Sequence, residues 1–285
     1  MTSKKIVIVA GMHRSGTSAL TRAINLAGVP LPSNLMPATP ENSDGYWEPI
    51  DLAFLHNAIL ESLGSQWDDF REVPLAWFDG AEANRFGIEL GNWITQEIAG
   101  KDSLLIKDPR LCRLIPLWQK VCAALDIELY TVIAVRNPIE VVKSLQTRNQ
   151  FLPMKSAILW LRHFIDAERF TRGQPRSFVD FDGLMNNALP TMHRVAAELN
   201  FAFPVPDSEL GPLLDAALKP SLRHHVATRD DLAKTGAPTS PPMIVYPWVL
   251  DAAEGKNPPF SVLDDVAHQL RELEKGRGIK YSPAA

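Results

Sequence analysis

A glycine-containing segment near the N-terminus holds the first residues whose types and spacing could do chemistry. The apolar run Ile6–Ala10 stops at Gly11, and a helical pattern resumes at about Thr17. Glycines at both ends of the intervening loop let backbone N–H groups point into one concavity, and the following helix adds its unpaired first-turn amides. The segment predicts a phosphate-binding loop. A strand-to-helix turn that binds nothing is the alternative. The expected anion contacts are Gly11, Met12, His13, Arg14, Ser15, Gly16, Thr17 and Ser18.

One position of this loop departs from the pattern of nucleotide hydrolases. Thr17 stands where their loop carries lysine, and a cation comes instead at Arg14, inside the loop. ATP and GTP hydrolases use that lysine together with a Mg²⁺ ion held by the loop and a downstream aspartate. Arg14 suits the stabilisation of a leaving phosphate when the transferred group carries less charge than a phosphoryl group. We therefore expect chemistry that needs no metal ion.

A second candidate anion site lies in the stretch YTVIAVRNPIEVVKSL, residues 130–145. A strand is expected to end at Arg136, Asn137 can cap the next helix, and Pro138 suits the first helical position. Ser144 follows about two turns later, at the edge of a buried face. An arginine and a hydroxyl so placed can converge on one phosphate. An exposed serine beside an arginine in a surface ion pair is the alternative.

Together the two segments resemble the sulfotransferase family, whose donor is 3′-phosphoadenosine 5′-phosphosulfate (PAPS) and whose product is the bisphosphate PAP. GMHRSGTS resembles the family's 5′-phosphosulfate loop, and the likeness covers about residues 5–200. It implies a P-loop NTPase-like fold with Arg14, Gly16, Thr17 and Ser18 at the 5′-phosphate, and Arg136 and Ser144 at the 3′-phosphate. Farther along the chain, LKPSLRHH at 218–225 could add Arg223 to the 3′-phosphate site. The family's glycine-rich C-terminal cofactor loop has no clear counterpart.

Sulfuryl transfer to a hydroxyl needs a base near the acceptor oxygen. Cytosolic members of the family use a histidine after the second strand, but this chain has LLIKDPRL there, at 104–111. In this respect it looks more like the bacterial and carbohydrate- or tyrosyl-directed branches, whose base is a glutamate after the first helix. Glu48 is the matching residue. Tyr46 and Trp47 could shield its carboxylate, raise its pKa and stack on a sugar. A solvated carboxylate at a helix start is the alternative.

Charged residues around the second strand supply further candidates. Asp108 is the second candidate for the base, and Asp44 and His56 are weaker ones. Lys107 could neutralise the sulfuryl oxygens or the leaving phosphate, or it could be a solvated charge at the end of a strand. Arg110 could bind the acceptor or the donor, or merely pair with Asp108.

The elements that must position these residues follow from hydrophobic patterns. Short, mostly apolar runs predict strands at Lys5–Ala10, Ser103–Ile106, Leu129–Val135 and Ser177–Phe181. Helical patterns lie at Thr17–Ala27, Asp51–Leu63, Arg113–Leu125 and Met154–Phe170. Their alternation predicts an α/β fold with a parallel β-sheet flanked by helices. We expect one domain over residues 1–285, with a cofactor-binding core at 1–200 and a helical and loop-rich extension at 201–285 that covers the site.

Composition excludes several classes of protein. A net charge of −4 gives no support for a nucleic-acid binder, and no apolar run reaches the length of a membrane span. The only cysteines, Cys112 and Cys122, cannot form a disulfide framework or a four-cysteine zinc site, and we expect both to be buried. A cytoplasmic location is the simplest interpretation. Oligomeric state is not indicated by the sequence.

The sequence thus predicts a metal-independent, PAPS-dependent sulfotransferase that acts on a hydroxyl of a carbohydrate or another small molecule. One alternative is a P-loop kinase that phosphorylates a small molecule with ATP. The loop without lysine and the second anion site argue against it. The other alternative is a nucleotide-binding protein without catalytic activity. Arg14, Lys107 and Glu48 argue against that interpretation.

Overall fold

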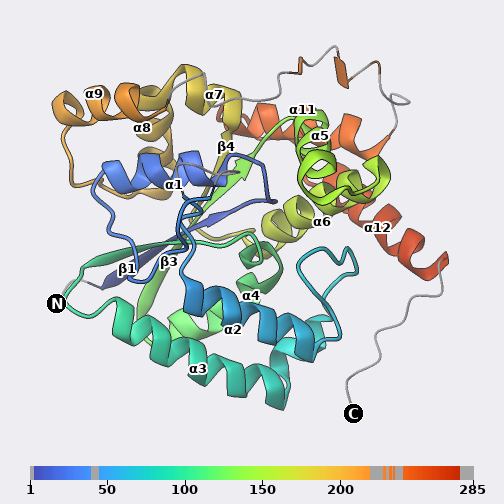
Figure 1. The fold of residues 1–285 in the computed structure, drawn as a ribbon, viewed down its shortest axis with the longest axis horizontal. Helices are drawn as coiled ribbons and strands as arrows, with labels where there is room; N and C mark the ends of the chain where they lie inside the picture. Colours follow the sequence, from blue (N-terminus) through green and yellow to red (C-terminus); the bar gives the residue numbers. More distant parts are fainter. Residues whose placement is uncertain are drawn as a thin grey trace.

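A four-stranded parallel β-sheet lies at the centre of the fold (Figure 1). The computed structural model describes residues 3–39, 45–218, 227–228, 231–232, 234 and 240–276. The strand order is β2–β1–β3–β4, and each neighbouring pair is parallel. The strands are β1 (Lys4–Ala10), β2 (Ser103–Lys107), β3 (Ile127–Val135) and β4 (Arg176–Asp180). The expected α/β fold is confirmed.

Hydrophobic side chains bury both faces of the sheet. Ile6–Ala10 of the central strand β1 are completely buried, with Ile8 opposite Ile106 on one side and Thr131 on the other. A strand covered on both faces needs apolar residues at successive positions. This is why the strands were visible in the sequence as short apolar runs.

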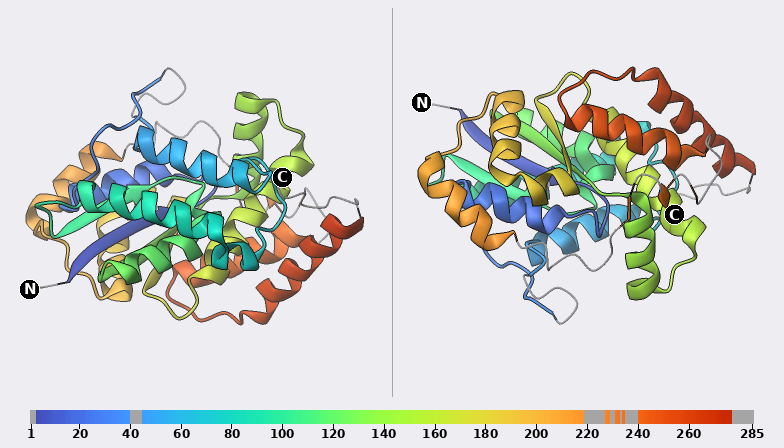
Figure 2. Two further views of the ribbon diagram at one scale, coloured as in Figure 1. Left: turned by 90° about the horizontal axis from the view of Figure 1, so that it is seen from below. Right: turned by 90° about the horizontal axis from the view of Figure 1, so that it is seen from above.

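Helices cover the two faces as separate layers (Figures 1 and 2). One layer consists of α1 (Thr17–Leu26), α8 (Ala188–Leu199) and α9 (Asp207–Ala217). The other contains α4 (Leu111–Ala124), α6 (Pro153–Phe170) and α11 (Pro241–Ala253), with α2 (Ile50–Ser62), α3 (Ala81–Glu97) and α12 (Ser261–Gly276) packed outside them. Shorter connecting elements are η1 (Leu75–Asp79), α5 (Pro138–Asn149) and α7 (Phe181–Asn186).

The predicted elements are all present, with ends that differ by one or two residues. The extension after residue 200 contains more helix than its prolines suggest. Pro212 lies inside α9 and Pro247 inside α11. Both helices persist because their apolar faces are buried, α9 against α1 and α8, and α11 against β4. Within the described ranges, no helix combines the length and apolar composition needed to cross a bilayer.

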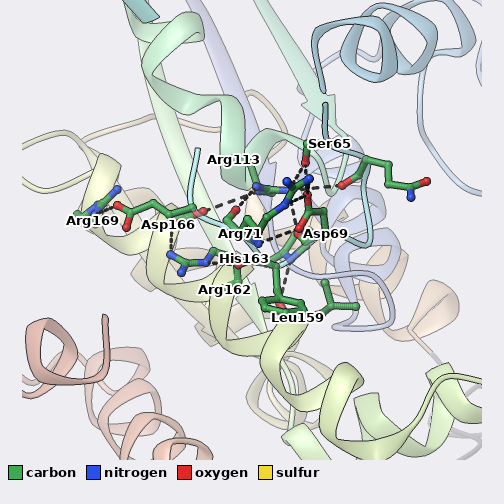
Figure 3. A network of polar contacts seen from close by, with 12 residues as sticks. Ser65, Asp69, Arg71, Arg113, Leu159, Arg162, His163, Asp166 and Arg169 are labelled. Atoms are coloured by element: carbon green, nitrogen blue, oxygen red, sulfur yellow. Dashed lines mark hydrogen bonds and ion pairs between the residues drawn. The ribbon is translucent and has the colours of Figure 1, made fainter. Parts of the chain in front are cut away.

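A buried polar network joins α4, α6 and the segment before η1 (Figure 3). Arg113 and Asp166 have no exposed surface, and Arg162 is 1% exposed. Arg162 Nη1 lies 3.1 Å from Asp166 Oδ1, and Arg113 Nη1 donates to the carbonyl of Asp69 at 2.8 Å and to Ser65 Oγ at 3.3 Å. We call these residues, Ser65, Asp69, Arg113, Arg162 and Asp166, the interior cluster. Its charges are paired within the protein, as buried charges require.

Candidate functional site

The candidate site lies at the carboxyl ends of β1 and β3. β1 leads directly into α1 on one face of the sheet, whereas β3 leads through α5 to α6 on the opposite face. Where successive connections leave an open parallel sheet on opposite faces, a crevice forms outside the strand ends, and ligands bind there. The fold therefore brings the two predicted anion sites to one edge.

The loop after β1 has the backbone that a phosphate cradle needs. Gly16 has a φ of 82°, and a Cβ atom there would lie 2.2 Å from Phe181 Cδ2. Gly16 also forms the N-cap of α1, and no side chain caps this helix. Its first-turn amides and positive dipole end are thus left for a ligand. Arg14, with a φ of 70°, is a non-glycine residue in the left-handed region, a conformation often found at functional sites.

Arg14 connects the loop to the second anion site. Its Nε donates to Ser144 Oγ at 2.7 Å, and its carbonyl accepts a hydrogen bond from Arg136 Nη1 at 3.4 Å. Arg136 is oriented by Glu140, whose Oε2 lies 2.6 Å from Arg136 Nε, and by the ring of Phe181, 4.4 Å from the guanidinium carbon. The two predicted anion sites are adjacent.

Both sites open into one cavity, which holds about 900 Å³ counted to its open mouth. The cations that line it are Arg14, Arg22, Lys107, Arg136 and Arg148. Glu48 is its lining carboxylate, and its apolar part includes Phe181, Met185, Ala217 and Leu218. Among the lining residues that the structure describes, positive charge is in clear excess.

Glu48 lies in this cavity as one half of an ion pair. Its side chain is only 5% exposed, and Lys107 Nζ lies 2.6 Å from its Oε1. The same ammonium donates to the carbonyl of Tyr46 at 2.9 Å, and Arg110 Nη1 lies 3.6 Å from Glu48 Oε2. Tyr46 and Trp47 also line the cavity, as expected. The surroundings of the carboxylate are cationic as well as aromatic.

Asp108 points away from the cavity into a buried chain of hydrogen bonds. Its Oδ1 accepts from the backbone N–H and Nη1 of Arg110, both at 2.9 Å, and its Oδ2 lies 2.9 Å from His56 Nδ1. Trp118 Nε1 donates to His56 Nε2 at 3.1 Å. Since an indole N–H can only donate, His56 carries its proton on Nδ1 and donates to Asp108. We call Trp118, His56, Asp108 and Arg110 the orienting chain.

The geometry of this chain favours a positioning role for Asp108 over that of a base. Burial opposes its charge, but Arg110 and His56 outweigh burial and hold the pKa of the carboxyl well below its usual range. Asp108 has no exposed surface, and it does not line the cavity. His56 is equally buried and has both ring nitrogens engaged. Asp44, the remaining weaker candidate, lies outside the described residues.

The loop residues divide into two groups. His13, Arg14, Gly16, Thr17 and Ser18 line the cavity. Gly11, Met12 and Ser15 do not, because they form the turn itself: the Gly11 N–H donates to Cys112 Sγ at 3.0 Å, and the Ser15 N–H donates to the Met12 carbonyl at 3.1 Å. Ser144 reaches the site through Arg14. Arg223 lies outside the described residues.

Arg148 and Phe181 are among the lining residues that were not singled out from the sequence. Arg148 follows Ser144 by one helical turn on α5, so the spacing could have shown it. Phe181 comes directly after β4, and its ring touches both the loop at Gly16 and the guanidinium of Arg136. The contact of Phe181 with Arg136 depends on the tertiary fold and could not be predicted from the sequence.

His13 lines the cavity and contacts the ring of Trp67. Its ring packs edge-on against Trp67, with centroids 4.6 Å apart. Burial lowers its pKa well below the ordinary value, and the charges of Arg148, Arg110 and Lys107 lower it further. The imidazole is therefore neutral at physiological pH.

Several solved structures are similar to the chain. A sulfotransferase from Alicyclobacillus acidocaldarius is 13% identical over 90% of this chain and 98% of that one, with a TM-score of 0.46. The sulfotransferase domain of the Synechococcus PCC 7002 olefin synthase is 14% identical over 93% and 96%, with a TM-score of 0.43. The sulfotransferase domain from the curacin biosynthetic pathway is 15% identical over 95% and 99%, with a TM-score of 0.44.

All three are sulfotransferases, the family that the sequence motifs resemble. No protein-family model and no curated protein matches the chain.

Proposed function

We propose that this chain is a sulfotransferase that uses PAPS and an acceptor hydroxyl. The donor supplies a sulfuryl group whose sulfur is bonded to a 5′-phosphate oxygen. In the reaction the acceptor oxygen forms a bond to sulfur, the bond from sulfur to the 5′-phosphate breaks, and its electron pair stays on the phosphate. The acceptor loses its proton to a base. The residues of the cavity fit these requirements.

The observation that best supports this function is the contact between Arg14 and Ser144. Arg14 belongs to the loop suited to one anionic group, and it contacts both Ser144 and Arg136, which suit another. A nucleotide with a 5′-phosphate and a 3′-phosphate has two anionic ends on one ribose, and adjacent sites that open into one cavity match it. Charge-assisted hydrogen bonds from arginine to phosphate are among the strongest in proteins.

Glu48 is the proposed base. It lines the same cavity as the loop, and Lys107 holds its carboxylate at 2.6 Å. A charged carboxylate can accept the acceptor's proton, and Lys107 can then turn to the oxygens around sulfur or to the leaving phosphate. Tyr46 and Trp47 border this end of the cavity, and aromatic side chains suit the faces of a sugar. We therefore propose a carbohydrate or another small hydroxyl compound as the acceptor.

Thermal denaturation with PAP or with ATP and Mg²⁺, each with and without EDTA, tests the donor. We expect PAP to raise the Tm with or without EDTA, and ATP to have little effect. Ser144→Ala should reduce the rise with PAP. Thr147→Ala, an exposed hydroxyl on the same helix, should not. A rise with ATP that EDTA abolishes would instead favour a kinase.

A further inference from the structure

Two cations contact the carboxylate of the proposed base, and each lies against a different oxygen. Lys107 Nζ is 2.6 Å from Glu48 Oε1, and Arg110 Nη1 is 3.6 Å from Glu48 Oε2. The first separation is that of a charge-assisted hydrogen bond, whereas the second is longer and acts through charge. Lys107 lines the cavity. Arg110 is 9% exposed and is not among the lining residues that the structure describes.

Hydrogen bonds hold the guanidinium of Arg110 in one orientation. Its Nε donates to Asn57 Oδ1 at 2.7 Å, and its Nη1 donates to Asp108 Oδ1 at 2.9 Å. Asp108 in turn contacts His56, which precedes Asn57 on α2. Glu48 comes two residues before the start of the same helix. The helix that fixes Arg110 therefore also follows directly on the carboxylate that Arg110 faces.

Asp108 compensates the charge of Arg110 whatever the protonation state of Glu48. Burial opposes the charge of Asp108, but Arg110 and His56 outweigh burial and hold the pKa of its carboxyl well below the usual range. Asp108 therefore stays ionised when Glu48 accepts a proton, and Arg110 keeps a carboxylate partner at 2.9 Å. Because arginine does not lose its proton in proteins, Arg110 also cannot exchange protons with a base beside it.

We propose that Arg110 is a positioning residue, which holds Glu48 Oε2 in place while Oε1 takes the acceptor's proton. This inference rests on the proposed sulfotransferase function, because it concerns the base of that reaction. Lysine has a flexible stem, so Lys107 can turn to the sulfuryl oxygens or the leaving phosphate and leave Oε1 open. The acceptor's proton moves to Oε1, the acceptor oxygen bonds to sulfur, and the electron pair of the breaking bond stays on the 5′-phosphate. Arg110 keeps the carboxylate from following the ammonium.

Crystal structures of the full chain carrying Lys107→Met test the positioning directly, because this variant mimics the departure of the ammonium. Glu48 Oε2 should remain beside Arg110 and close to within about 3.2 Å of Nη1, with or without PAP. Adding Arg110→Gln to Lys107→Met should release the carboxylate from this position. A Glu48 carboxylate that turns away from Arg110 in Lys107→Met would overturn the proposal. This test needs no acceptor.

Turnover separates a positioning role from a merely structural one. The release of PAP from PAPS is measured with methyl glucoside, with 4-nitrophenol and with water alone as the acceptor. Arg110→Gln should lower kcat about 10- to 100-fold, with KM and the Kd for PAP within about twofold of the wild type. Arg110→Lys should restore part of the loss. Lys120→Gln, which removes an exposed cation from α4, should leave kcat unchanged.

A double-mutant cycle with Glu48 identifies the group through which Arg110 acts. In the Glu48→Gln background, Arg110→Gln should lower kcat by no more than about twofold, because the carboxylate it positions is already gone. Asn57→Ala, which frees Arg110 Nε and keeps every charge, gives the same cycle if Arg110→Gln does not fold. Equal losses in both backgrounds would overturn the proposal. Loss of PAP binding in the wild type would instead refute the proposed function, without altering the contacts of Glu48 in Lys107→Met.

Discussion

Arg110 and Arg113 are three residues apart at the start of α4, yet their buried charges have different surroundings. Arg113 joins the interior cluster, where it meets Asp166 of α6 and backbone carbonyls of the segment before η1 (Figure 3). Arg110 ends the orienting chain, and its guanidinium faces Glu48 at the edge of the cavity. Among the residues that the structure describes, no member of the interior cluster lines that cavity.

Burial and pairing alone therefore do not identify functional charges in this protein. Asp166 and Asp108 are both completely buried and both lie against arginines. The two aspartates differ in the surroundings of their arginine partners. The arginines beside Asp166 are enclosed by packed protein, whereas Arg110, beside Asp108, also lies near Glu48, a carboxylate that lines the cavity. Changes in the interior cluster should alter stability, whereas changes at the cavity should alter turnover.

The largest expected effect is on stability. Asp166→Ala removes the fully buried carboxylate beside Arg162 and Arg113 and leaves Arg162 with Glu274 as its carboxylate partner, and removal of one member of a buried pair costs about 3–5 kcal/mol. Urea denaturation measures the loss, with Glu89→Ala, which breaks the exposed pair with Arg85, as the control at less than about 1 kcal/mol. If the folded fraction of Asp166→Ala also lost PAP affinity, the separation between the two clusters would be wrong.

Glu48→Gln should affect turnover rather than stability. Loss of a general base lowers kcat by about 100-fold or more, while PAP should bind nearly as it does to the wild type. Steady-state kinetics and calorimetry measure the two effects. Glu61→Gln, on the exposed face of α2, serves as the control. Undiminished turnover in Glu48→Gln would remove the base from this position.

We expect an effect of intermediate size at Asp180, which caps α7 beside Phe181. Burial raises the pKa of Asp180 to about 6, so between about pH 4 and about pH 6 the folded state binds more protons than the unfolded state. Its contribution to stability therefore falls as the pH rises through this window. Asp180→Asn can still accept the Gly183 N–H and should be about 2 kcal/mol more stable than the wild type near pH 7. Denaturation at several pH values checks this; a constant difference would contradict it.

The smallest effect should come from the far end of the orienting chain. Trp118→Phe keeps an aromatic side chain, though a smaller one, but removes the N–H that donates to His56 Nε2, which leaves a buried acceptor without its partner. We expect a loss of about 1 kcal/mol in urea denaturation and little change in kcat. Trp93→Phe, which also changes an indole packed near this ring, is the matched control. A large fall in kcat would show that the chain controls Glu48 more tightly than proposed.

The fold could be predicted from the sequence because its signals are local. Buried parallel strands are continuous apolar runs, and Asn137 and Pro138 mark the start of α5. Asn137 indeed accepts a hydrogen bond from the Ile139 N–H at 3.0 Å. Strand β4 ends one residue before the predicted Phe181, because the Asp180 side chain caps α7 there. α3 was missed although its buried positions have helical spacing, since Gly87 and Gly91 interrupt the pattern.

The candidate site was only partly accessible from the sequence. Spacing showed that Arg14 and Ser144 each suit an anion, but not that two side chains 130 residues apart would touch. Asp108 was a plausible base as long as its surroundings were unknown. Its contact with Arg110, two residues later, was one of the alternatives weighed from the sequence. Its contact with His56 depends on how α2 packs beside the end of β2, and residue spacing does not encode that packing.

The sulfur contact beneath the phosphate loop bears on how readily the protein reacts with thiol reagents. Cys112 accepts the Gly11 N–H, and burial raises the pKa of its thiol, as it does for Cys122. Thiolates, the reactive form, are thus scarce at both native positions. A cysteine introduced at Leu152, whose side chain is 75% exposed, would be modified selectively, and a fluorophore there could report ligand binding without removal of either natural thiol.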